Sequence, residues 1–137
     1  MKNKIPSTII LIIILINIMF MPFEGRSVAA VSQKFNKMEL ADTYARKAHQ
    51  AFRKKDFLNA AKDFEKAYEL YNQKVYINNA ITAYLSYASE QAHNKNYDSA
   101  ITCCNKVLSI RNNDNNAKEM LSDIYYSRGA DYFYTGK

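Results

Sequence analysis

The sequence contains very few of the residues that interrupt helices. Its only prolines are Pro6 and Pro22, and no glycine occurs between Gly25 and Gly129. Proline and glycine are the strongest local breakers of regular structure, so this long interior has no breaker of either kind. It also lacks the alternation of apolar and polar residues, bounded by turn residues, that is typical of strands. The sequence therefore predicts an all-α protein that is helical nearly throughout.

Motifs of enzymatic chemistry are missing as well. The chain has no glycine-rich phosphate loop, no nucleophile elbow and no His-Glu-x-x-His. Its two histidines, His49 and His93, belong to no cluster of cysteines and carboxylates with the spacing of a metal site. We therefore expect no catalytic residue, no metal and no cofactor, and we predict that the protein is not an enzyme.

Positive charge is modest and dispersed. The formal net charge is +6 at pH 7, and the one run of three basic residues, Arg53–Lys55, is followed at once by Asp56. A nucleic-acid-binding surface needs clustered basic residues, whereas a short basic run followed directly by a carboxylate is typical of a solvated turn. We expect no nucleic-acid partner.

Residues 1–30 differ in character from the remainder of the chain. They combine a basic start, an almost wholly apolar run at Ile9–Phe20 and small residues at Ser27–Ala30. This is the build of a secretory signal peptide, and we expect cleavage after Ala29 or Ala30. The alternative is a retained membrane anchor, although the apolar stretch is shorter than the roughly 20 residues that a spanning helix needs. We expect export to the periplasm, cell envelope or extracellular space, with membrane contact only through residues 1–30 if they are not cleaved.

The remaining chain repeats itself with a spacing of forty residues. The stretch Ala60–Ala67 returns as Ala100–Val107, and a third, partial copy starts at Tyr125 and Gly129, one residue beyond the next forty. A fixed spacing indicates a repeated supersecondary unit. We divide the chain into a polar lead-in at 31–37 and a repeat domain at 38–137, with repeats at about 41–74, 75–114 and 115–137.

Apolar residues three and four apart predict the helices of these repeats. The first repeat gives helices at Met38–Lys54 and Phe57–Tyr71, which would pack as an antiparallel hairpin. We expect Asp56 to cap the second helix and Asn72 to end it in a left-handed turn. The later helices are expected at about Val75–Asn94, Tyr97–Ile110 and Ala117–Thr135, with a linker at Asn112–Asn116.

The cysteines and most of the eleven tyrosines are expected to serve packing. Cys104 takes the place of Phe64 in the repeat, which predicts a small core residue. Cys103 is its neighbour, and adjacent helical side chains point about 100° apart, so a disulfide between them would need distorted geometry. Most tyrosines occupy apolar helix positions, for which core packing is the default interpretation.

This pattern resembles the tetratricopeptide repeat, in which a large residue and a small one precede an aromatic, and Ala-x-x-x-Phe and a further alanine follow. The resemblance extends over 41–137, although the family spacing is about 34 residues and Asn72 and Asn112 stand where proline is usual. It implies antiparallel helix hairpins stacked as a short right-handed solenoid. The matching residues are Tyr44, Ala48, Phe57, Ala60, Phe64 and Ala67, then Tyr84, Ala88, Tyr97, Ala100, Cys104 and Val107, then Tyr125, Gly129, Tyr132 and Gly136.

The resemblance also implies a function, because the first helix of each such repeat lines a concave groove that holds an extended peptide or a partner helix. Carried over by position, the groove candidates are Arg46, His49, Arg53, Ser86, Ser89, His93, Tyr126, Ala130 and Phe133. Such a groove would be mildly basic and aromatic and would suit an acidic or tyrosine-tolerant segment. We expect an exported protein-protein interaction or assembly scaffold whose partner is a protein or peptide.

Two other functions remain open at this point. The chain could be the N-terminal targeting module of a longer protein whose catalytic domain is absent. It could also be a structural protein that associates with itself through its last helix. An aromatic stretch at Tyr125–Tyr134 has an outer face that no predicted element covers, and it would form the interface of a homodimer.

Overall fold

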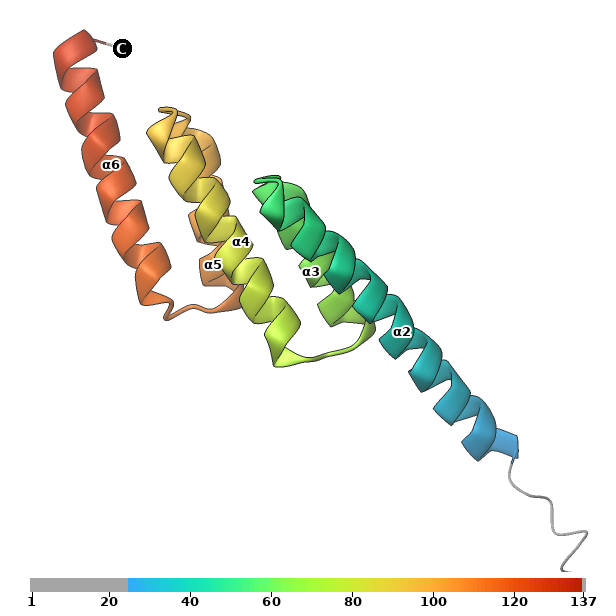
Figure 1. Cartoon of the computed structure of the whole chain (residues 1–137). Helices are drawn as coiled ribbons and strands as arrows, with labels where there is room; N and C mark the ends of the chain where they lie inside the picture. The colour runs from blue at the N-terminus through green and yellow to red at the C-terminus, as the bar shows by residue number, and fades with distance from the viewer. Residues whose placement is uncertain (1–24, 137) are drawn as a thin grey trace, which may run out of the picture. The chain divides into compact units, whose positions relative to one another are not determined.

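In the computed structural model, residues 25–136 are described, and all their regular structure is helical. The helices are α2 (Gly25–Arg53), α3 (Phe57–Leu70), α4 (Lys74–His93), α5 (Tyr97–Ile110) and α6 (Asn115–Thr135), shown in Figure 1. The prediction of an all-α protein is confirmed. None of these described helices is both long and apolar enough to cross a membrane. The apolar run of the expected signal peptide lies outside the described residues.

The helix boundaries agree with the predicted ones for α3, α4 and α5 and differ for the first helix. α2 begins at Gly25 and includes Val31–Lys37, which we expected as a lead-in ahead of a helix starting at Met38. No proline or glycine occurs between Gly25 and Met38, so no helix breaker stops the helix from extending in the N-terminal direction. Every residue of Val31–Lys37 is exposed.

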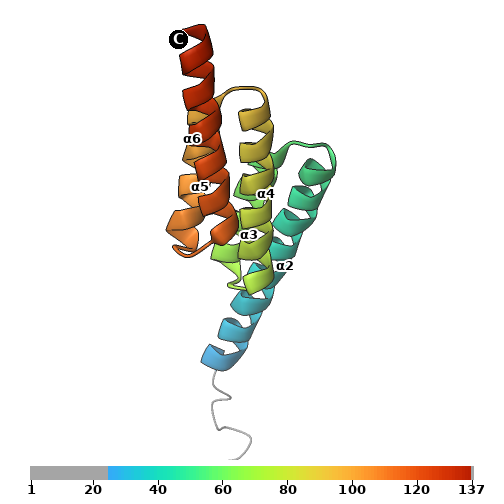
Figure 2. The ribbon, with the colours of Figure 1, turned by 90° about the vertical axis from the view of Figure 1, so that its left-hand side faces the viewer.

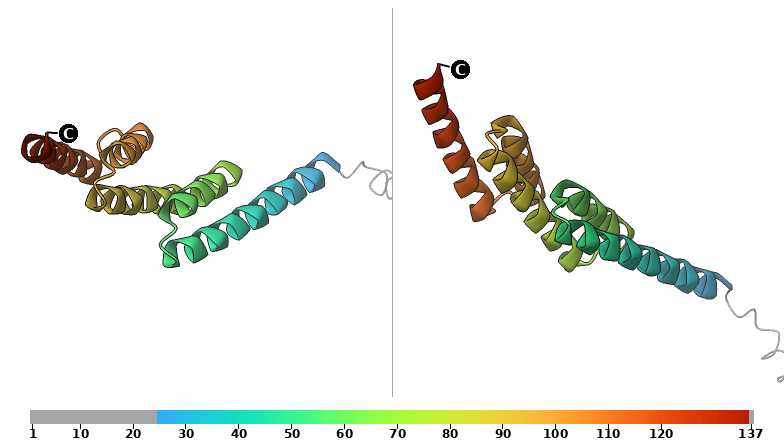
Figure 3. Two further views of the ribbon diagram at one scale, coloured as in Figure 1. Left: turned by 90° about the horizontal axis from the view of Figure 1, so that it is seen from above. Right: turned by 45° about the horizontal axis from the view of Figure 1, so that its top comes forward.

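The chain divides into two units, Met1–Asn36 and Lys37–Lys137, and the packing described below lies within the second. There, successive helices lie side by side and run in alternating directions (Figures 1, 2 and 3). α4 packs against both α3 and α5, and α6 packs against α5 and also contacts α4.

Two hydrophobic clusters hold these helices together. Both are rich in fully buried alanines, whose small side chains allow the helix backbones to approach closely. The first cluster joins α2, α3 and α4 through Ala41, Ala45, Ala48, Phe64, Ala67, Tyr76 and Ala80. The second joins α3 to α6 through Ala60, Ala61, Ile81, Ala83, Tyr84, Ala88, Ala100, Cys103, Cys104, Val107, Ala117 and Ile124. Cys104 is therefore a core residue, as its place in the repeat predicted.

The repeat is visible in the backbone at the turns that follow α2 and α4. Lys55 and Lys95, forty residues apart, have φ of 62° and 63°, both left-handed. In the first turn the Asp56 N–H donates to the Ala51 carbonyl (3.0 Å), and the Lys55 N–H donates to that of Phe52 (3.0 Å). The second turn has the same pair of bonds one period later. This is the Schellman arrangement, which satisfies carbonyls at a helix C-terminus.

Two of the predicted helix ends are wrong in their details. Asn72 is not left-handed: α3 ends at Leu70, and its C-cap residue Tyr71 is extended. Asp56 does precede α3, but its carboxylate accepts from the side-chain amide of Asn59 (2.9 Å) and from no backbone N–H of the helix. The side chain that does cap a helix is that of Asp114, which accepts from the Ala117 N–H (3.0 Å) and starts α6 at Asn115.

Candidate functional site: the cleft between α4 and α6

Tyrosine hydroxyls that donate to carboxylates on neighbouring helices fix the helix positions around the site. Tyr76 of α4 donates to Asp42 of α2, and Tyr84 of α4 donates to Glu65 of α3 (2.7 Å). The Asp42 hydrogen bond, with burial adding to it, raises the pKa of Tyr76 to about 12. Burial, followed by the Glu65 hydrogen bond, raises the pKa of Tyr84 further above its ordinary value. Both hydroxyls therefore stay protonated and keep donating at neutral pH.

A third bond of this kind holds α6 against α5. Tyr97 donates to Asp131 (2.7 Å), and the ammonium of Lys95 also contacts this carboxylate (3.0 Å). The Tyr97 and Lys95 hydrogen bonds lower the pKa of Asp131 below its usual value. The left-handed turn at Lys95 thus supplies a cation to α6, in addition to ending α4.

At the other end of α6, Arg111 ties the start of the helix to α4. Its guanidinium donates to the buried Asp114 carboxylate (3.1 Å) and to the side-chain oxygen of Asn78 (2.6 Å). Because Asp114 also caps α6, one carboxylate joins the end of α5 to the start of α6. Side chains outside the cleft therefore hold both ends of α6, one through Arg111 to α4 and the other through Tyr97 and Lys95 to α5 and the turn before it.

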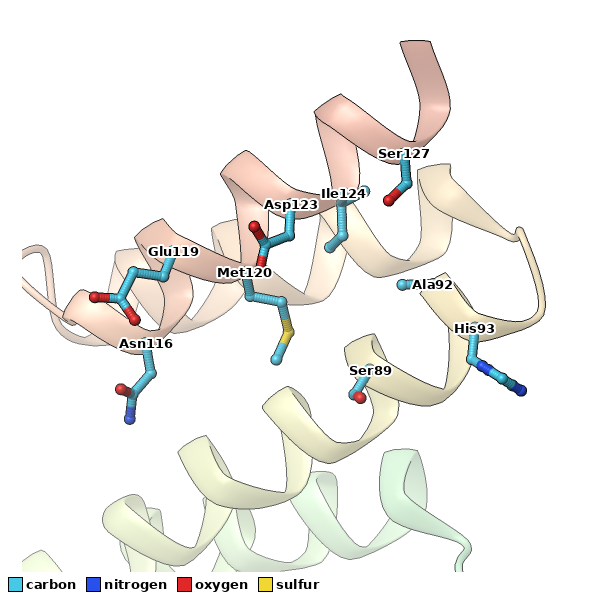
Figure 4. A pocket seen from close by; sticks show the side chains of 9 residues that line it. All are labelled: Ser89, Ala92, His93, Asn116, Glu119, Met120, Asp123, Ile124 and Ser127. Atoms are coloured by element: carbon cyan, nitrogen blue, oxygen red, sulfur yellow. The ribbon is translucent and has the colours of Figure 1, made fainter. Parts of the chain in front are cut away.

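An open cleft of about 530 Å³ lies between α4 and α6 (Figure 4). The side chains of Met120 and Ile124 point from α6 toward α4 and give the cleft an apolar floor. Ile124 is almost fully buried and Met120 is half-buried. The lining comprises Ser89, Ala92 and His93 from α4, and Asn116, Glu119, Met120, Asp123, Ile124 and Ser127 from α6.

The charge of this cleft is negative. Glu119 and Asp123 lie one turn apart on α6 and are exposed, and within residues 25–136 neither carboxylate has an ion-pair partner. Like charges at this spacing repel one another on a helix, so a cation bound between them would stabilise the pair. The cleft therefore suits a ligand that carries both basic and apolar groups.

The predicted groove residues are only partly brought together. Ser89 and His93 line the cleft. Arg46 and Arg53 lie on α2 away from it, and the His49 ring packs edge-on against Phe64, with ring centroids 4.9 Å apart. Arg46 donates to the Thr43 hydroxyl (3.1 Å) on its own helix. The basic residues expected to give the groove its charge are therefore not part of the α4–α6 cleft.

The three candidates Ser86, Tyr126 and Phe133 also fall outside the cleft. The Ser86 hydroxyl donates to the Thr82 carbonyl (2.9 Å) of its own helix. Tyr126 and Phe133 are exposed, at 81% and 82% of their surface, on other faces of α6. The spacing to the third copy is one residue longer than forty, and one residue rotates a helical side chain by about 100°. A shift of 41 from Ser86 leads to Ser127, which lines the cleft, but the same shift from Ser89 and His93 leads to Ala130 and Tyr134, which do not.

Other hollows of this helical unit offer less to a ligand. One of about 410 Å³, between α3, α4 and α5, contains Glu65, Glu69 and Arg111. These charges already have partners within the protein: Lys106 for Glu65, Lys66 for Glu69 and Asp114 for Arg111.

Cys103 borders a smaller hollow of about 320 Å³. Both cysteines are free and buried, and burial raises the pKa of each thiol, to about 11 for Cys104. A buried thiol with a raised pKa is a poor nucleophile.

The α4–α6 cleft therefore offers shape, apolar surface and negative charge. In the part of the chain that the structure describes, no group of three histidine, cysteine or carboxylate side chains is placed to hold a metal ion. No family model, no curated protein and no solved structure matches this chain.

Proposed function

We propose that this protein is a binding module that holds a segment of another polypeptide, helical or extended, in the cleft between α4 and α6. The observation that carries the proposal is the combination of an apolar floor, Met120 and Ile124, with the carboxylates of Glu119 and Asp123, which have no ion-pair partner among residues 25–136. An amphipathic segment in an apolar groove is a recurrent mode of peptide recognition.

The proposal includes a finer description of the fold: a short right-handed solenoid of tetratricopeptide-like hairpins. Two findings support it. The left-handed turns at Lys55 and Lys95 have the same hydrogen bonds forty residues apart. The cleft lies between α4 and α6, which are the first helices of the second and third repeats. In repeat proteins of this kind the first helices line the concave binding surface.

The partner segment that we propose is basic and apolar. The sequence alone favoured an acidic partner, because Arg46 and Arg53 were expected in the groove. The cleft instead contains Glu119 and Asp123, whose charge favours lysine or arginine. Export to the cell envelope or beyond, through residues 1–30, is part of the proposal and rests on the sequence alone.

The test is binding of a labelled helical peptide of about 14 residues to the full chain, followed by fluorescence anisotropy. The peptide carries leucine and lysine at positions i, i+3, i+4 and i+7, the spacing of one helix face. We expect binding that weakens at least tenfold in the variant Glu119→Lys/Asp123→Lys. The matched control is Glu39→Lys/Glu69→Lys, which changes the net charge equally at exposed sites outside the cleft. Equal affinity of the two variants would contradict the proposal.

A further inference from the structure

The chain itself carries a segment with the chemistry that the cleft selects. Val31, Lys34, Phe35 and Met38 occur at positions i, i+3, i+4 and i+7 of α2 and so share one face of that helix. Val31 and Phe35 are large apolar residues that expose 68% and 58% of their surface. Lys34 is exposed beside them, and so is Lys37, one turn further along the helix. We call residues 31–38 the basic apolar segment.

The cleft has the complementary arrangement. On α6, Glu119 and Asp123 are one turn apart, and Met120 and Ile124 are one turn apart beside them. In the basic apolar segment, Lys34 and Lys37 are likewise about one turn apart, next to Val31 and Phe35. One turn of helix rises about 5.4 Å, so two lysines can face two carboxylates while the apolar residues face the apolar floor.

We propose that the cleft between α4 and α6 binds the basic apolar segment of a second copy of this chain. The inference rests on the proposed function and names its partner. Each copy would use its cleft for one neighbour and its basic apolar segment for another. Such a contact joins two different surfaces, so it closes into a ring or continues as a chain of copies.

A different self-association would use the aromatic residues of α6. Tyr126, Phe133 and Tyr134 are highly exposed, but the charged residues between them, Arg128 and Asp131, are already paired with Asp98 and Lys95 of the same chain. That contact would be symmetric, with the same surface on both copies. The two arrangements predict different results when variants are mixed.

The test is co-purification of two differently tagged copies of the full chain produced in the same cells. Variant A is Lys34→Glu/Lys37→Glu, and variant B is Glu119→Lys/Asp123→Lys. We expect wild-type copies to co-purify, and A with A or B with B to do so at least tenfold less, because like charges then face each other. Mixing A with B should restore co-purification, since the cleft of A is intact for the segment of B and both reversed surfaces are again complementary.

The matched control is Lys62→Glu/Lys74→Glu, which reverses two exposed lysines elsewhere and should co-purify like wild type. Circular dichroism of A and B checks that both remain helical. The proposal is overturned if wild-type copies do not associate, if A and B each associate normally, or if mixing A with B restores nothing. Association lost only on Tyr126→Ala/Phe133→Ala would assign the contact to the aromatic face of α6 instead. Peptide binding that persists without self-association would leave the proposed function standing and reject the second copy as the partner.

Discussion

At the scale of single residues, the hydrogen bonds between tyrosines and carboxylates are the polar contacts that join helices most directly. Tyr76 is nearly fully buried, and its hydroxyl donates to Asp42 on another helix. Tyr76→Phe removes the donor and leaves the ring, so we expect a loss of about 1.5–3 kcal/mol in the free energy of unfolding, the usual range for a bond to a charged group. Urea unfolding at pH 7 measures it. Tyr126→Phe, at an exposed position, is the control and should change stability by less than about 0.5 kcal/mol.

The hydrogen bond between Tyr76 and Asp42 also predicts that stability depends on pH in the alkaline range. The pKa of Tyr76 is raised from 10.0 to about 12 in the folded protein. A raised folded pKa means that the contribution of this bond is complete below about pH 10 and is lost as the pH rises through about 12. The difference in unfolding free energy between wild type and Tyr76→Phe should therefore shrink over this window. A difference that stays constant from pH 9 to pH 12 would show that the hydroxyl does not donate to Asp42.

The left-handed backbone at Lys55 and Lys95 predicts that substitution by glycine there stabilises the protein, contrary to the usual effect of glycine. Lys55 has φ of 62°, a conformation that costs a residue with a Cβ about 1–2 kcal/mol and costs glycine almost nothing. We expect Lys55→Gly to raise the free energy of unfolding by up to about 1 kcal/mol, because the greater entropy of unfolded glycine offsets part of the gain. Lys62→Gly, inside α3, is the control and should lower it by about 1 kcal/mol. Destabilisation of both variants in thermal unfolding would contradict the left-handed turn.

At the scale of helices, the periodicity of the sequence predicted the ends of α3, α4 and α5. It did not predict the start of α6, which depends on one capping side chain. The apolar spacing and the repeat placed α3, α4 and α5 within about one residue of their ends. The start of α6 was placed two residues late because Asp114 looked like part of an asparagine-rich linker. Its capping role depends on its position relative to Ala117 and Arg111, which periodicity does not encode.

The two aspartates at helix starts allow a direct comparison. Both Asp56 and Asp114 occupy the N-cap position, but only the side chain of Asp114 accepts a backbone N–H of its helix. We expect Asp114→Ala to lower the free energy of unfolding by about 1–2 kcal/mol, or more because Arg111 also loses a partner. Asp56→Ala should cost less than half as much. Equal costs in chemical denaturation would mean that the two side chains play the same role.

The cleft shows where residue-by-residue transfer from a repeat stops working. Of the three candidates from the second copy, Ser89 and His93 line the cleft and Ser86 does not. Tyr126 and Phe133 lie outside the cleft, and neither a shift of 40 nor one of 41 from the second-copy candidates leads to the cleft residues of α6 as a set. Glu119 and Asp123, which set the charge, precede Tyr125, the first residue of the third copy that matches the repeat pattern. The sequence feature that could have identified them is the helical spacing of the cleft residues of α6, which recur every three or four positions from Asn116 to Ser127.

At the scale of the whole helical unit, burial diminishes toward the end of α6. Its fully buried residues are Ala117 and Ile124, both in the first half, and the residues from Tyr125 onward are exposed except for Ala130 and Asp131. The second half is held by the contacts of Asp131 with Tyr97 and Lys95 and by the ion pair of Arg128 with Asp98. In stacked helical proteins, local opening follows the number of contacts that each element makes with its neighbours.

This gradient predicts the pattern of amide hydrogen exchange. Amides of α6 beyond Ile124 should exchange faster than those of α4, which lies between α3 and α5, because α6 can fray from its end without disturbing either hydrophobic cluster. Tyr97→Phe, which removes the hydrogen bond to Asp131, should accelerate exchange in this half of α6 and leave that of α4 unchanged. The measurement is exchange of the full chain followed by mass spectrometry of its peptides.

Repeating the exchange over a range of protein concentrations connects stability to assembly. If copies join through the cleft, slower exchange at high concentration should appear in 31–38 and in Asn116–Ser127 together, since both surfaces become covered in the same event. Variant A should lose this concentration dependence in both places, and Lys62→Glu/Lys74→Glu should keep it. Protection confined to Tyr125–Tyr134 would instead identify the aromatic face as the interface. Exchange that does not change with concentration in any segment would mean that the copies stay apart and that the cleft remains free for another protein.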